Sequence, residues 1–207
     1  MDSRELQLVE IVNLNDDLFL PWLDLFETAF PAPERVLVSS QLQLLRAKMA
    51  GATTDHHLLA ALDGERALVG MLQYQVLPKI PAAFLWYFAI KPNERSKGLG
   101  SQMYQAMLKR LGPASPRAII FEVEIPDDAP SDEQRRLAER RITFYRRLGA
   151  RLLGGVHYIQ QVGWHQPPIP MHVMLQPLLA MDPHDAYQLA KEVFEDSITQ
   201  IGTPTLD

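Results

Sequence analysis

Apolar and polar positions along the first half of the chain predict short strands and two helices. Residues 57–62 and 67–76 flank Asp63-Gly64, a dipeptide typical of a β-hairpin turn. Residues 83–90 are nearly all apolar, as expected for a strand that is buried on both faces. The elements predicted here are a strand at residues 6–12, helices at about 16–28 and 34–49, and strands at 57–62, 67–76 and 83–90.

The second half alternates between helices and strands. Ser131 and Gln134 form a capping-box pattern that opens a helix, and Gly149 ends it. The predicted elements are helices at about 98–111, 131–148 and 182–201, and strands at 117–125, 152–161 and 172–175. This order predicts a single domain of the mixed α/β (α+β) class over residues 1–207.

Composition excludes several kinds of function. The 207 residues carry a formal net charge of −5, which argues against nucleic acid as the main partner. The absence of cysteine excludes disulfides and a cysteine nucleophile, and the scattered histidines show no metal-binding spacing. With no signal peptide and no membrane-length apolar run, we expect a cytoplasmic protein that binds no metal and no membrane.

The most specific feature is the turn that follows the apolar strand. Gly98 and Gly100 open a helix, whose first backbone N–H groups have no partner within the helix. Glycines let a phosphate approach that backbone closely, and Arg95 and Lys97 add positive charge. The turn lacks the Gly-Lys-Ser/Thr of a Walker loop and the third glycine of a dinucleotide-binding loop. It therefore predicts a site for a different pyrophosphate ligand.

This turn resembles the acetyl-CoA motif of the GNAT superfamily of N-acyltransferases. The motif residues are Phe88, Ile90, Pro92, Arg95, Gly98 and Gly100. The resemblance implies that backbone amides from Ser96 to Ser101 hold the CoA pyrophosphate, and that the strand edge at residues 88–90 pairs with the pantetheine arm. The implied binding residues for acetyl-CoA, the acyl donor, are Phe88, Ala89, Ile90, Arg95, Ser96, Lys97, Gly98, Leu99, Gly100 and Ser101.

The similarity extends over roughly residues 5–176 and leaves the predicted helix at 182–201 outside it. Residues 142–150 resemble a downstream Phe-Tyr segment of the family, with Ala150 in place of its usual aromatic residue. The resemblance implies a GNAT-like fold, a twisted mixed sheet of about seven strands with helices on both faces.

Three residues are candidates for the chemistry. The resemblance puts Tyr145 near the CoA sulfur, where its phenol could protonate the leaving thiolate; the alternative is a core tyrosine. Glu122 and Glu124 share one face of a strand, so mutual repulsion should raise the pKa of at least one of them. Either could accept the proton of the incoming amine, and either could instead belong to a solvated face or an ion pair.

Candidates for acceptor binding are Glu34, Arg35, Arg141 and Tyr158. Arg141 falls within the apolar arc of the helix at 131–148, where an unpaired charge would be costly. It needs either an internal partner, Glu122 or Glu124, or a carboxylate on the substrate.

We therefore expect an N-acetyltransferase that moves an acetyl group from acetyl-CoA to a primary amine by direct attack in a ternary complex. The amine would belong to a small molecule or a peptide. A non-catalytic acyl-CoA-binding sensor and an enzyme for longer acyl groups remain alternatives. The apolar positions of the helix at 182–201 would pack either on the domain itself or on a second subunit. A homodimer is therefore one of the two expectations.

Overall fold

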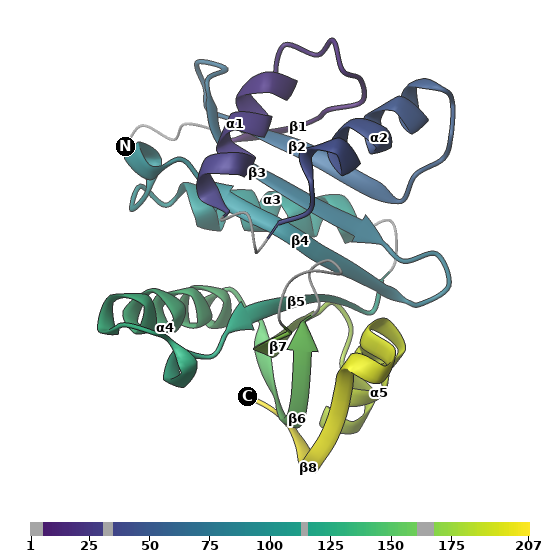
Figure 1. Cartoon of the computed structure of the whole chain (residues 1–207), viewed down its shortest axis with the longest axis vertical. Helices are drawn as coiled ribbons and strands as arrows, with labels where there is room; N and C mark the ends of the chain where they lie inside the picture. The colour runs from purple at the N-terminus through teal and green to yellow at the C-terminus, as the bar shows by residue number, and fades with distance from the viewer. Residues whose placement is uncertain (1–5, 31–34, 113–115, 161–167) are drawn as a thin grey trace. The chain divides into compact units, whose positions relative to one another are not determined.

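The computed structural model describes residues 6–30, 35–112, 116–160 and 168–207. These residues fold into two compact units: the described parts of 1–76 and 85–115 form the first, and those of 77–84 and 116–207 form the second. In the described part of the chain, eight strands are hydrogen-bonded in the order β1-β2-β3-β4-β5-β7-β6-β8, and helices connect several of them along the sequence (Figure 1). The predicted α/β class is confirmed, with one strand more than expected.

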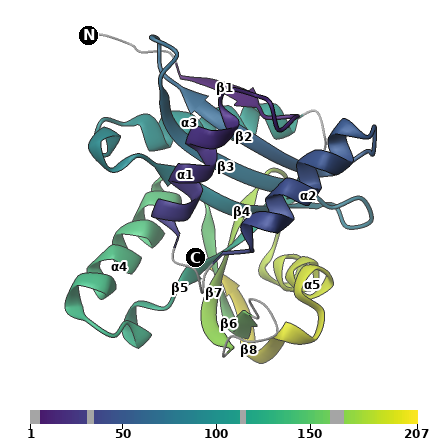
Figure 2. The same ribbon diagram turned by 45° about the horizontal axis from the view of Figure 1, so that its top comes forward.

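The first unit is an antiparallel sheet with helices on both of its faces. Tyr87 of β4 packs against Phe26 of α1, whereas its neighbour Phe88 contacts Tyr104 of α3. Adjacent residues of a strand point to opposite faces, so α1 and α3 cover different faces (Figure 2). The elements are β1 (Gln7–Glu10), α1 (Phe19–Ala29), α2 (Val38–Met49), β2 (His56–Leu62), β3 (Leu68–Val76), the latter part of β4 (Ala82–Ile90), a 3-10 turn (Pro92–Glu94) and α3 (Leu99–Leu111).

The helix α1 begins three residues later than the pattern predicts. Asp16 does not cap it, because its carboxylate accepts a hydrogen bond from the N–H of Leu18 and forms a local turn instead. The helix then starts at Phe19 without a side-chain cap.

One carboxylate ties the edge strand of this unit to three other elements. Glu10 of β1 contacts Lys48 of α2 at 2.9 Å and His57 of β2 at 3.0 Å, and it also pairs with Arg110 of α3. Burial alone would raise the pKa of Glu10, but the hydrogen bonds to His57 and Lys48 outweigh it and lower the pKa to about 2. The polar network therefore fixes β1 although the strand is only four residues long.

The second unit also carries helices on two faces of its strands. Phe121 of β5 packs on Tyr145 of α4 at a ring distance of 4.5 Å, and the adjacent Ile120 belongs to the apolar cluster that includes α5. Ser131 caps α4 by accepting from the N–H of Gln134, as the capping-box pattern predicts. The elements are the start of β4, β5 (Ala118–Glu124), a 3-10 turn (Pro126–Asp128), α4 (Asp132–Arg147), β6 (Arg151–Gln160), β7 (Ile169–Pro177), α5 (Pro183–Phe194), a 3-10 turn (Glu195–Ser197) and β8 (Ile198–Leu206).

The prediction of one helix over residues 182–201 is wrong in its second half. The helix α5 ends at Phe194, Glu195 adopts a left-handed backbone with φ of 48°, and residues 198–206 form β8 instead. Strand β8 pairs antiparallel with β6, with Leu153 opposite Leu206. This pairing is tertiary, so the helical spacing of Val193, Ser197 and Ile201 did not reveal it.

A close backbone contact at Gly155 makes the pairing of β6 with β8 possible. A Cβ atom at Gly155 would lie 2.3 Å from the carbonyl oxygen of Thr203, and the glycine has a φ of +73°. We predict that Gly155→Ala lowers the free energy of unfolding by about 2–4 kcal/mol, from overpacking and left-handed strain together. Chemical denaturation measures the loss, and limited proteolysis should show earlier cleavage within residues 198–207.

The matched control is Gly112→Ala at the end of α3. Gly112 has a right-handed φ of −48°, and an added Cβ there meets no atom within 4 Å. Equal stability of the Gly155 and Gly112 variants would contradict the prediction.

Candidate functional site

The turn between β4 and α3 holds its backbone in an unusual conformation. Ser96 has a φ of 64° and Gly98 a φ of 80°, both in the left-handed region. Gly98 is the N-cap of α3 and provides no side-chain cap, so the N–H groups of the first helical turn stay open. A Cβ atom at Gly98 would meet nothing within 4 Å, which leaves room for a ligand against the backbone. These features fit a phosphate group.

The basic residues of this loop already have partners within it. Arg95 donates from Nε to the carbonyl oxygen of Ile90 at 3.2 Å, and Lys97 forms a 2.9 Å ion pair with Glu94. Both side chains are exposed. The positive charge expected from Lys97 is therefore partly offset, and the backbone amides carry more of the attraction for an anion than the sequence suggested.

Phe88, Ala89 and Ile90, predicted to line the pantetheine arm, lie at the end of β4. The parallel ladder between β4 and β5 covers only Ala82–Phe84, so these three residues lie beyond it. Pairing of this edge with a ligand stays a prediction.

Glu122 of β5 is held by two side chains of β6. Tyr158 donates its phenolic hydrogen to one carboxylate oxygen, and Gln160 donates an amide hydrogen to the other. Burial raises the pKa of Glu122, and the two hydrogen bonds only partly counter it. The pKa is raised as predicted, but the cause is burial and not repulsion by Glu124. Gln160 was missed, although its spacing of two from Tyr158 puts both on one face of a strand.

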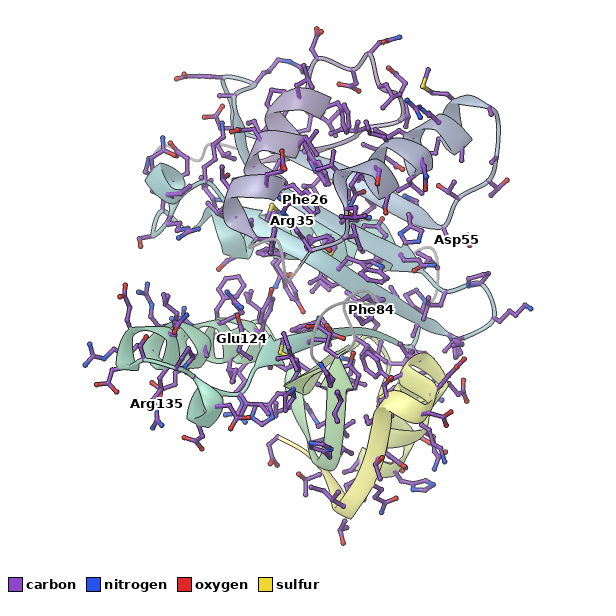
Figure 3. All side chains as sticks on the ribbon, viewed as in Figure 1. Phe26, Arg35, Asp55, Phe84, Glu124 and Arg135 are labelled. Carbon is purple, nitrogen blue, oxygen red and sulfur yellow. The ribbon has the colours of Figure 1, made fainter. Side chains whose placement is uncertain are left out.

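Glu124 lies two residues further along the same face and has a different partner. Its Oε1 forms an ion pair with Arg141 of α4, and its Oε2 is buried without a hydrogen-bond partner among the described residues. Figure 3 labels Glu124 where β5 meets the end of α4. Arg141 is exposed. Half of the surface of Leu137, an apolar residue of the predicted arc, is exposed as well, so the apolar arc of α4 is narrower than predicted. A role for Arg141 toward a substrate stays a prediction.

Tyr145 is almost fully buried, with 6% of its surface exposed. Its ring packs on Phe121 at 4.5 Å and on Phe144 at 5.1 Å. Burial raises the pKa of Tyr145; the charge of Arg141 lowers it and that of Glu124 raises it. The phenol is therefore protonated at neutral pH and can act as a hydrogen-bond donor.

The remaining predicted acceptor-binding residues have structural contacts. The ring of Tyr158 is buried against Phe194 at a ring distance of 4.3 Å, and its hydroxyl donates a hydrogen bond to Glu122. Arg35 forms a 3.1 Å ion pair with Glu27, and its guanidinium lies 5.6 Å from the ring centre of Phe26. Figure 3 labels Arg35 and Phe26 near each other. Glu34 lies outside the described residues.

The fold, together with a turn whose open backbone amides fit a phosphate group, is typical of acyl-CoA-dependent transferases. Residues 19–150 match the family model "Acetyltransferase (GNAT) family". The chain therefore belongs to the GNAT family and is an acyltransferase. No curated protein matches the sequence.

Solved structures support the same fold. A protein from Bacteroides thetaiotaomicron assigned to the GNAT acetyltransferases is 21% identical, with a TM-score of 0.67 over 91% of this chain and 98% of its own. Spermidine N-acetyltransferase from Vibrio cholerae, solved with CoA and spermine, is 13% identical with a TM-score of 0.60, covering 83% and 96%. A GCN5-related N-acetyltransferase from Kribbella flavida is 20% identical with a TM-score of 0.55, covering 84% and 98%. In the part of the chain that the structure describes, no helix could cross a membrane.

The contact between Tyr158 and Glu122 leads to a prediction about proton affinity. Tyr158→Phe removes a hydrogen bond that lowers the pKa of Glu122, so we expect that pKa to rise further. Carboxyl ¹³C NMR titration of Glu122 measures the change. Tyr187→Phe is the control, because Tyr187 belongs to the same apolar cluster and shows no hydrogen bond to Glu122.

The same shift sets the sign of the stability change with pH. Because the folded-state pKa of Glu122 is raised, its contribution to stability is full below the unfolded pKa of about 4.3 and is lost as the pH rises through the folded pKa. An unchanged pKa in Tyr158→Phe would show that the hydroxyl does not bind the carboxylate.

Proposed function

We propose that this protein transfers an acetyl group from acetyl-CoA to a primary amine by direct attack in a ternary complex. The observation that carries the proposal is the left-handed backbone at Ser96 and Gly98, which leaves the first amides of α3 open. Six consecutive backbone amides, from Ser96 to Ser101, would hold the pyrophosphate of the acyl donor. Family membership supports the reaction class, and the described contacts support the roles below.

Glu122 is the proposed general base. A protonated amine must lose a proton before its nitrogen can attack the thioester carbon. A carboxylate with a raised pKa accepts that proton more readily than an ordinary one, and Glu122 has such a pKa. Glu124 is less suited, because its carboxylate is paired with a cation, Arg141, whereas both partners of Glu122 are neutral donors.

Tyr145 is the proposed acid. As the new C–N bond forms and the C–S bond breaks, the leaving thiolate needs a proton or a hydrogen-bond donor. The buried phenol of Tyr145 stays protonated at neutral pH and can supply either. The protonated amine gives up two protons in all. The first goes to Glu122, directly or through water, and the second, released as the amide forms, replaces the proton that the thiolate takes up, so that Tyr145 ends protonated. No covalent enzyme intermediate is required.

Binding of the acyl donor is the first prediction of this proposal. Gly98→Asp should abolish micromolar binding of acetyl-CoA in calorimetric titration, because a carboxylate would repel the pyrophosphate and fill its place. Aspartate tolerates the left-handed region, so the variant should stay folded. Gly64→Asp adds the same charge in an exposed hairpin turn where an added Cβ meets no atom within 4 Å, and it should bind normally.

Wild-type protein that is folded but binds no acetyl-CoA would overturn the proposal. Tighter binding of a longer acyl-CoA would mean that the protein catalyses the same kind of transfer with a different acyl donor. Acetyl-CoA binding with no turnover of any amine would favour the sensor alternative.

The second prediction concerns pH. The acid limb of kcat/KM should have an apparent pKa above that of an ordinary glutamate, about 4.3, and activity should fall as the pH drops through it. Glu122→Gln should remove this limb and reduce kcat by roughly 10²–10⁴-fold. Glu124→Gln is the matched control on the same face of β5, and it should keep the limb. A limb lost in Glu124→Gln but kept in Glu122→Gln would assign the base to Glu124.

A further inference from the structure

Three polar side chains from two strands of the second unit meet over β7, the strand that lies between them. Glu122 comes from β5, and Tyr158 and Gln160 come from β6. Each is paired in register with a residue of β7. The pairs are Glu122 with Val173, Tyr158 with Met171, and Gln160 with Ile169. The three β7 residues are spaced by two, so all three polar side chains share one face, and those of β6 reach Glu122 across β7.

Both partners of Glu122 can accept hydrogen bonds as well as donate them. A phenolic hydroxyl does both, and a glutamine amide has N–H donors at one end and a carbonyl acceptor at the other. The guanidinium of Arg141, which holds Glu124, can only donate and keeps its positive charge. A cation of this kind stabilises only the ionised carboxylate, whereas a partner that donates and accepts can bind the carboxylate and the carboxylic acid. The partners of Glu122 therefore suit a carboxyl group that changes its protonation state.

The two oxygens of Glu122 are not equivalent as sites for a proton. Tyr158 donates to Oε1 and Gln160 donates to Oε2. A proton on Oε1 would force the hydroxyl of Tyr158 to turn its own hydrogen elsewhere, and that hydroxyl is buried and makes no other hydrogen bond among the described residues. A proton on Oε2 requires only that the amide of Gln160 turns over, so that its carbonyl oxygen takes the place of its nitrogen. Gln160 is half-buried, so the end of the amide that turns away can reach water.

No charged group controls Glu122 in place of these two partners. In the described part of the chain, burial raises the pKa of Glu122 and only the two hydrogen bonds lower it. Glu124 is paired with Arg141, and β8 carries no ionisable side chain. His157 of β6 and His172 of β7 each precede a residue of this face, so they point to the other face. On α5, whose apolar residues pack on this face, Tyr187 is buried, Asp185 is paired with Arg117, and His184, Lys191 and Glu192 are exposed.

We propose that Gln160 is a positioning residue for Glu122, and that its amide turns over when Glu122 takes up the first proton of the amine. Before transfer, the amide N–H donates to Oε2 of the carboxylate. The arriving proton forms an O–H bond at Oε2, and this O–H donates to the carbonyl oxygen of the turned amide. Loss of the proton to water reverses the turn. This inference rests on the proposed function and names the residue that lets Glu122 hold and release a proton.

The first test follows the turn in the wild-type protein without an acyl donor. The side-chain amide ¹H and ¹⁵N resonances of Gln160 are recorded against pH, together with the carboxyl ¹³C resonance of Glu122. As Glu122 takes up its proton, both amide protons of Gln160 should reach the shifts of the exposed Gln102, with the same midpoint as the carboxyl titration. Gln102 should not change at that midpoint. An amide proton of Gln160 that keeps its hydrogen-bonded shift while Glu122 titrates overturns the inference.

Two substitutions at Gln160 separate positioning from a structural role. Gln160→Lys supplies a charged donor and no acceptor, so the acid limb of kcat/KM should move at least about one unit to lower pH, and kcat should fall about tenfold. Gln160→Met neither donates nor accepts, so kcat should also fall about tenfold, but the limb should not move to lower pH. Gln200→Lys adds the same charge at an exposed position of β8 and should leave the limb unchanged. Wild-type kcat in Gln160→Met, or one limb shared by both Gln160 variants, overturns the inference.

The NMR titration keeps the two proposals distinguishable, because it needs neither acetyl-CoA nor an amine. Protein that binds no acetyl-CoA would overturn the proposed function, and the titration would still decide whether the amide of Gln160 turns over with the protonation of Glu122. An amide that donates to Glu122 throughout the titration, in protein that acetylates amines, overturns this inference and leaves the proposed function intact.

Discussion

The left-handed backbone between β4 and α3 is the constraint on which the proposed donor site depends. Ser96 and Gly98 both have positive φ values, and they turn the chain so that α3 begins without a side-chain cap. A capping side chain at Gly98 would consume the amides that a pyrophosphate needs. The two left-handed residues and the uncapped helix therefore carry a local cost that the proposed anion site would explain. Lys97 is paired with Glu94, so in that site the backbone would provide most of the attraction.

In the second unit, the proposed general base depends on the burial of Glu122. Glu122 is an ionisable group with a raised pKa, and Tyr158 and Gln160 hold its two oxygens. Removing either partner would leave a buried carboxylate poorly satisfied, which is costly. The same arrangement costs stability at neutral pH and makes the carboxylate a better proton acceptor, as stability and activity often oppose each other at functional sites.

Local features could be predicted from the sequence, and features set by distant partners could not. The glycines of the turn, the capping residue Ser131 and the hairpin at Asp63-Gly64 act over a few residues, and the structure has each where the pattern indicated. Strand β8 was missed although residues 198–206 are rich in β-branched residues, because the helical spacing that continues to Ile201 was given more weight. Its pairing with β6, which Gly155 permits, decides the outcome. The predicted cause of the raised pKa of Glu122, repulsion by Glu124, was wrong because the actual cause is burial. Burial is a tertiary property that strand alternation does not reveal.

The ion pairs of the candidate residues bear on which acceptors the protein can bind. An acidic acceptor was a reasonable expectation while Arg141 lacked a partner, but its guanidinium is engaged by Glu124. Arg35 is likewise paired with Glu27. A carboxylate on the acceptor would have to displace Glu124 or Glu27 to reach either guanidinium. The displaced carboxylate would then need a new partner, which makes the exchange costly. Pairing within the protein therefore argues against an acidic acceptor.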